Sequence, residues 1–177
     1  LIEAARRLPG VLFYLIGGWP EDIEAMKKRA EGCSNVRFAG FVANPRLPRW
    51  LAAADALVLP TSGQFDHARV TSPLKLFEYM AARRPVVASA IPALEGFLLH
   101  EQNALVVEPD SPAALAGALA KLIAEPELGA RLAERAWREV QHQTWARRAA
   151  AILEHLGFAV EPDPDAPPGG SATRGAA

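Results

Sequence analysis

The sequence contains a single cysteine, Cys33, among its 177 residues. One thiol excludes a disulfide within the chain and any zinc site built from several cysteines. Basic and acidic side chains are also nearly balanced, 19 against 20, so no charge of one sign dominates. The net charge of −1 provides no overall attraction for nucleic acid or for an anionic membrane. Any site that binds an anion must therefore be local.

Long hydrophobic runs are missing as well. No stretch approaches the roughly 18 consecutive apolar residues of a membrane-spanning helix. The first residues also lack the basic, apolar and cleavage regions of a signal peptide. Residues 1–8 have the apolar spacing of a helix but no N-cap before it. We therefore expect the chain to begin within a helix and to be a fragment of a longer protein.

Short apolar runs alternate with helical patterns along most of the chain. Strands are expected at 11–17, 35–41, 55–60, 85–89 and 103–109. Helices are expected at 1–8, 21–31, 47–54, 73–82, 111–124, 127–141 and 145–156. This alternation is typical of an α/β domain with a doubly wound, mostly parallel sheet, which is Rossmann-like.

In such a domain ligands bind beyond the carboxyl ends of the strands, so the loops after residues 17, 41, 60 and 89 are expected to converge on one crevice. We expect one domain over residues 1–156. The tail over 157–177 is rich in Pro, Gly and Ala, and its last dozen residues are expected to be disordered.

The stretch TSPLKLFEYMAARRPVVAS, residues 71–89, contains an unusual helix start. Ser72 is a good N-cap, and Pro73 suits the first helical position, where its missing N–H costs nothing. A capping box would then have Glu or Gln three residues after the cap, but this sequence has Lys75. A cation at the positive end of the helix dipole is mildly unfavourable unless an anion binds there. The pattern thus indicates a phosphate site.

Glu78 follows three residues later on the same face of the expected helix. A carboxylate one turn behind a phosphate site is well placed to accept hydrogen bonds from sugar hydroxyls, and the two sites together describe a nucleotide. The alternative is that Lys75 and Glu78 form an exposed surface pair worth about 0.3 kcal/mol. The residues alone leave both interpretations open.

Several segments in order resemble one enzyme family. They are LIEAARRLPGVLFYLIGG, NVRFAGFV, LAAADALVLPT, SPLKLFEYMAA, RPVVAS and QNALVVEPDSPAALAGAL. Residues 1–155 are similar to the donor-binding C-terminal half of retaining glycosyltransferases of family 4 (group 1), which have the GT-B fold. The resemblance implies binding of a nucleotide-diphosphate sugar and transfer of a hexosyl group to an unknown acceptor. It also implies an N-terminal acceptor-binding domain in the same protein.

The resemblance also implies roles for particular residues. Glu78 corresponds to the second glutamate of the family's E-x7-E motif, which holds the donor ribose. The donor diphosphate would be bound by backbone amides and side chains at Ser72, Pro73, Leu74 and Lys75. The base or rim of the donor site would be formed at Gly17, Gly18, Phe41 and Val42. A plain strand-to-helix turn at the glycines and an ordinary buried Phe41 are the alternatives.

Three departures from the family pattern are visible. Val70 stands where the first glutamate of the motif is expected, and Arg83 stands where relatives carry glycine after the helix. If Arg83 has a left-handed backbone, it costs up to about 1 kcal/mol relative to glycine. The family's basic pair and its first strand would precede Leu1. We therefore assign no catalytic residue, expect this fragment alone to be inactive, and expect a gap at the centre of the sheet or a neighbouring chain in it.

The resemblance implies no cofactor other than the nucleotide-sugar co-substrate, and no metal, because basic side chains and helix dipoles offset the diphosphate charge. We expect no nucleic-acid partner. The expected location is the cytoplasm, including the inner face of the membrane. Any contact with the membrane is expected only through the half of the protein that precedes Leu1. A non-catalytic nucleotide-binding or interaction module of the same fold is the alternative function. A phosphorelay receiver domain is disfavoured because the strand ends carry no acidic residues.

Overall fold

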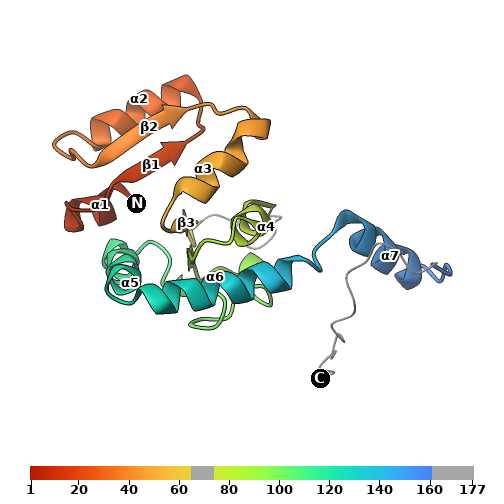
Figure 1. Cartoon of the computed structure of the whole chain (residues 1–177). Coiled ribbons are helices and arrows are strands. Elements are labelled where there is room, and N and C mark those ends of the chain that lie inside the picture. The colour runs from red at the N-terminus through yellow and green to blue at the C-terminus, as the bar shows by residue number, and fades with distance from the viewer. Residues whose placement is uncertain (65–73, 161–177) are drawn as a thin grey trace.

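The computed structural model describes residues 1–64 and 74–160 (Figure 1). Three residues discussed above, Val70, Ser72 and Pro73, lie outside the described residues, as does the tail from residue 161. The predictions for them therefore stay predictions.

The described chain alternates helices and strands in the predicted order. The strands are β1 (Phe13–Ile16), β2 (Val36–Gly40), β3 (Leu57–Leu59), β4 (Val86–Ser89) and β5 (Leu105–Val107). The α-helices are α1 (Ile2–Arg7), α2 (Pro20–Arg29), α3 (Leu47–Ala53), α4 (Leu74–Ala81), α5 (Pro112–Ala124), α6 (Pro126–Val140) and α7 (Trp145–His155). Short 3-10 turns are η1 (Asn44–Arg46) and η3 (Pro92–Leu94), which the sequence did not predict. The α/β class is confirmed.

The strands form two separate parallel sheets. β1 pairs with β2, and β4 lies between β3 and β5, with Leu57 opposite Val86 and Val87 opposite Leu105. Within the described residues no strand joins β1 to β3. The described strands are therefore divided between two sheets, and a further strand between them stays a prediction.

The three-stranded sheet is covered on both faces. Alternate residues point to opposite sides of a strand, so Val87 joins a cluster with α1 and α5, while Val86 and Ala88 join a second cluster with α4. Both ends of α6 contribute, through Leu132 to the first cluster and Val140 to the second. The two clusters thus cover the two faces of the three-stranded sheet.

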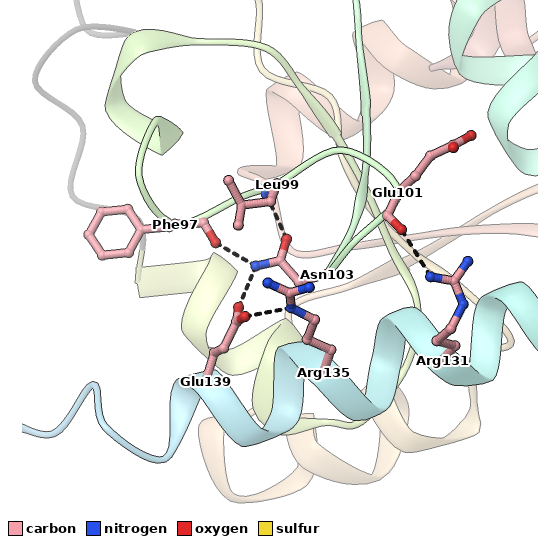
Figure 2. A network of polar contacts seen from close by, with 7 residues as sticks. All are labelled: Phe97, Leu99, Glu101, Asn103, Arg131, Arg135 and Glu139. Atoms are coloured by element: carbon pink, nitrogen blue, oxygen red, sulfur yellow. Dashed lines mark hydrogen bonds and ion pairs between the residues drawn. The ribbon is translucent and has the colours of Figure 1, made fainter. Parts of the chain in front are cut away.

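A polar network attaches the chain segment between β4 and β5 to helix α6 (Figure 2). The Asn103 side chain is almost fully buried; it accepts a hydrogen bond from the Leu99 amide at 2.7 Å and donates to the Phe97 carbonyl at 2.8 Å. It also donates to the carboxylate of Glu139, which accepts a second hydrogen bond from Arg135. Each polar atom of the buried amide is therefore satisfied, as a stable interior requires.

Arg83, which stands where relatives carry glycine, has a left-handed backbone with φ of 54°. Its guanidinium donates to Glu134 of α6 at 2.8 Å and lies 4.8 Å from the ring centre of Trp137. These contacts offset the conformational cost of a non-glycine residue at this angle. The residue that ends α4 thus also fastens α4 to α6.

Helix α7 extends from the end of α6 away from both sheets (Figure 1). It begins at an N-cap, Thr144, whose hydroxyl accepts from the Arg147 amide at 3.2 Å, but it buries none of its residues. Its large apolar side chains, including Trp145 and Ile152, are exposed. No helix in the described part of the chain is long and apolar enough to cross a membrane.

Candidate functional site

Helix α4 has one buried face and one exposed face. Leu76 and Met80 are buried in the cluster with β4 and anchor the helix to the sheet. Lys75 and Glu78 are exposed on the other side. Because the sequence places apolar residues at positions four apart, the helix turns its two charged residues outward together.

The first turn of α4 has the properties of an anion site. The first amides of a helix have no partner within it, and the dipole makes this end positive. Lys75 lies in that turn, and among the described residues it forms no ion pair with Glu78. This observation disfavours the surface-pair interpretation. The amides of Leu74 and Lys75 and the ammonium group could together hold a phosphate.

The turn after β1 brings the backbone close to the neighbouring strand. Gly17 and Gly18 have φ of 91° and 95°, a conformation that glycine adopts at little cost. The Gly17 amide donates to the Gly40 carbonyl at 2.7 Å, which ties the ends of β1 and β2 together. A Cβ at Gly17 would meet no atom within 4 Å, so backbone conformation rather than space requires glycine there.

A cavity of about 290 Å³ connects this turn with α4. Gly17 and Gly18 line one side of it, and Tyr79, the neighbour of Glu78, lines another. Burial raises the pKa of the Tyr79 hydroxyl above its ordinary value, and the carboxylate of Glu78 raises it further. The phenol therefore stays protonated at neutral pH and can donate a hydrogen bond into the cavity.

A second cavity, of about 270 Å³, lies at the carboxyl ends of β3, β4 and β5. Pro60, Ser89 and Asp110 are among its lining residues, and Leu15 lines both cavities. The loops after β1 and β3 therefore open into two adjacent cavities rather than into the single predicted crevice. The reason is the division of the sheet, because the carboxyl ends of β1 and β3 do not lie along one continuous edge.

Phe41 and Val42 are placed differently from the other predicted site residues. Phe41 is 84% exposed, which excludes the alternative of an ordinary buried phenylalanine. Neither residue lines either of the two cavities. Trp19, which follows the two glycines, is 76% exposed. The described structure thus places two large aromatic side chains on the surface beyond the ends of β1 and β2.

Sequence reasoning missed two residues of this region. Tyr79 escaped attention because an aromatic residue within an amphipathic helix is usually part of the core, although its position next to Glu78 was a signal. Asp110 has a left-handed backbone, which no sequence pattern revealed. For a metal, the described residues contain no group of three or more His, Cys, Asp or Glu side chains that could hold one.

Residues 1–125 match the family described as Glycosyl transferases group 1. The chain is 34% identical over 139 residues to the lipopolysaccharide core biosynthesis glycosyltransferase LpsE of Rhizobium meliloti (strain 1021). That match covers 76% of this chain and 38% of LpsE, so the chain spans less than half the length of this relative.

Solved structures show the same fold. The C-terminal domain of the group 1 glycosyl transferase LpcC from Francisella tularensis has a TM-score of 0.65 and 25% identity, over 81% of this chain and 76% of that one. Anabaena Alr3699/HepE, solved in complex with UDP and also with UDP-glucose, has a TM-score of 0.70 and 23% identity in its UDP complex. That match covers 89% of this chain and 44% of that one. With its parallel α/β architecture, one half of a GT-B fold, and a family match over residues 1–125, this chain belongs to the glycosyl transferases of group 1.

Proposed function

We propose that this chain is the donor-binding domain of a retaining glycosyltransferase, and that it binds a nucleotide-diphosphate sugar along α4. The observation that carries the proposal is the first turn of α4, where Lys75 is exposed and, among the described residues, forms no ion pair with Glu78. In this arrangement the ammonium group and the amides bind the diphosphate, and the carboxylate of Glu78 accepts hydrogen bonds from the ribose.

The cavity beside α4 supplies further contacts for this ligand. Tyr79 and the Gly17–Gly18 turn line the same cavity, so the donor can lie between α4 and the end of β1. The exposed ring of Phe41 offers a stacking surface for the base, with Val42 beside it. The complexes of Anabaena Alr3699/HepE with UDP and UDP-glucose, whose fold this chain shares, support a nucleotide-sugar ligand.

The transfer of a hexosyl group to an acceptor belongs to the intact protein. LpsE is more than twice as long as the segment that this chain matches, which supports an acceptor-binding domain in the remaining part. We propose that this domain supplies the acceptor site and any contact with a membrane, with the protein in the cytoplasm or at the inner face of the membrane. Cell fractionation of the intact protein tests the location.

We further propose that donor binding needs no metal. Lys75, the amides of α4 and basic residues of the intact protein would offset the charge of the diphosphate. Nucleotide binding should then be unchanged after EDTA treatment, and its loss on EDTA treatment with recovery on adding Mg²⁺ would contradict this proposal.

Ligand-detected NMR of the intact protein with UDP-, GDP- and ADP-sugars tests the function directly. We expect saturation transfer to one of the three, with competition by the matching nucleoside diphosphate. Incubation with that donor should release the nucleoside diphosphate, and the anomeric configuration of the product should match that of the donor. Binding without release of the nucleotide would favour the non-catalytic module of the same fold, and no binding of any of the three would refute the proposal.

A further inference from the structure

Asp110 joins two loops at the carboxyl ends of the strands. It lies just after β5, and its carboxylate oxygen Oδ2 accepts hydrogen bonds from the Ser62 hydroxyl and from the Gly63 amide, each at 3.0 Å. The Ser62 hydroxyl also accepts a hydrogen bond from the Gln64 amide at 3.2 Å. One carboxylate therefore organises the first residues of the loop that follows β3.

The two loops also approach closely at Gly63 and the Pro109 side chain. A Cβ built at Gly63 would lie 3.2 Å from the Cβ of Pro109, which is closer than side chains normally approach. A side chain at this position would require Pro109 to shift by a few tenths of an ångström. The close approach is independent of the hydrogen bonds, and both observations indicate that the loop after β3 is held against the loop after β5.

Asp110 carries a side chain at a position where the backbone conformation favours glycine. Its φ is 57°, a conformation in which glycine would be less strained. Arg83 and Glu101 share this conformation, and each uses a charged side chain to contact a helix: Arg83 contacts α6, and Glu101 pairs with Lys121 of α5. Among these left-handed residues of the described chain, Asp110 alone directs its charge to a loop at the carboxyl ends of the strands.

We propose that Asp110 is a positioning residue for the nucleotide site. Its carboxylate fixes Ser62 and Gly63 at the point where the chain leaves β3, and β3 packs against α4, the helix that carries Lys75. Asp110 and Pro60 line the second cavity, which shares the lining residue Leu15 with the cavity beside α4. The effect on nucleotide binding rests on the proposed function, whereas the fixing of the loop does not.

The competing explanation is purely conformational. Aspartate tolerates a left-handed backbone better than most residues, so it could serve only to form the turn. Asp110→Gly separates the two explanations, because it removes the carboxylate and relieves the backbone at the same time. Asp110→Asn keeps one acceptor oxygen without the charge. Glu101→Gly is the matched control, since it relieves the same conformation far from the loop after β3.

The experiment uses the intact protein and its variants, with two readouts. The first is hydrogen exchange of peptides that cover residues 60–64. We expect the exchange rate of these peptides in Asp110→Gly to rise about tenfold or more, which corresponds to the loss of one hydrogen bond to a charged group. Asp110→Asn should lie between this variant and the wild type. Gly63→Ala should also raise exchange, and Glu101→Gly should leave it unchanged.

The second readout is the Kd for UDP, GDP and ADP, each compared with its nucleoside. We expect Asp110→Gly to weaken diphosphate binding several-fold with little change for the nucleoside, because β3 packs against α4, whose first turn is the proposed phosphate end of the site. Exchange in Asp110→Gly equal to that in Glu101→Gly would overturn the proposal. Raised exchange with unchanged diphosphate affinity would overturn the positioning role. If the wild type binds none of the three nucleotides, the proposed function fails. In that case an exchange rate in Asp110→Gly equal to that of the wild type would additionally exclude the fixing of the loop.

Discussion

Helices α6 and α2 differ sharply in how they are packed. Six residues of α6 are buried, and both of its ends join the clusters that cover the three-stranded sheet. Helix α2, which covers β1 and β2, buries none of its residues. The part of the chain built on β3, β4 and β5 is thus a packed platform, whereas the part built on β1 and β2 is thinly covered.

This difference suggests a division of roles. The platform holds α4 through buried residues such as Leu76 and keeps Lys75 and Glu78 in a fixed place. The β1–β2 unit presents the glycine turn together with the exposed rings of Trp19 and Phe41. Stability is therefore concentrated in the platform, and the surface open to a ligand or to the rest of the protein lies beside it. The predictions below test this contrast by unfolding measurements on the intact protein.

The largest effect is expected in the core of the platform. Leu132 of α6 is completely buried, so Leu132→Ala should lower the free energy of unfolding by about 2–5 kcal/mol. Leu12, which precedes β1, is exposed, and Leu12→Ala should change the free energy of unfolding by less than about 0.5 kcal/mol. Urea unfolding measures both values, and similar losses for the two variants would remove the contrast.

A smaller loss is expected in the buried polar network of Figure 2. Asn103→Ala leaves the Leu99 amide and the Glu139 carboxylate without this partner, which should cost about 1–3 kcal/mol. The adjacent Gln102 is exposed, so Gln102→Ala is the control and should be nearly neutral. Equal effects of the two variants would show that the network does not fix the loop to α6.

Arg83 allows a test of backbone conformation against side-chain contacts. Arg83→Ala keeps the left-handed backbone and loses the contacts with Glu134 and Trp137, whereas Arg83→Gly loses the same contacts but relieves the backbone. We expect the glycine variant to be more stable than the alanine variant by up to about 1 kcal/mol. An alanine variant as stable as the glycine variant would contradict the left-handed conformation.

The smallest effect is a dependence on pH. A hydrogen bond from Lys121 lowers the pKa of Glu101 below its ordinary value of 4.5, and a hydrogen bond from Arg83 does the same for Glu134. Because the pKa is lowered in the folded state, the carboxylate stabilises the fold fully above pH 4.5, the ordinary pKa of the group. This stabilisation is lost as the pH falls below that value. Glu101 is exposed and Glu134 is partly exposed, so solvent screens both ion pairs and the effect is small.

Unfolding midpoints measured on both sides of pH 4.5 check this expectation. Wild-type stability should fall on the acid side, and Glu101→Gln combined with Glu134→Gln should flatten that fall. A double variant with the same acid dependence as the wild type would show that other groups cause it.

The order and type of the elements were predictable because each carries a local signal. The apolar run 11–17 contains β1, and the caps at Ser111 and Thr144 mark the starts of α5 and α7, where their hydroxyls accept backbone hydrogen bonds. The left-handed backbone of Arg83 was only a conditional expectation, because it came from relatives that carry glycine at this position. The gap between the sheets followed from a resemblance to longer proteins and not from any local pattern.

The arrangement of the site was less predictable. The contact between Asp110 and Ser62 joins residues that are 48 positions apart, and no periodicity links them. Tyr79 lines the cavity with Gly17 and Gly18 because of how α4 is placed against the β1–β2 unit, which is a tertiary relationship. The separation of the loops into two cavities likewise depends on how the two sheets are placed.

The central claim is that the first turns of α4 bind a nucleotide, and titration of UDP and uridine, or the matching pair of another base, into the intact protein tests it most directly. Glu78→Gln should weaken binding of nucleoside and nucleotide alike by about 1.5–3 kcal/mol, the range for a hydrogen bond to a charged group. Lys75→Ala should weaken binding of the diphosphate far more than of the nucleoside, and more at low salt than at high salt. Equal affinities for the wild type and both variants would contradict the account.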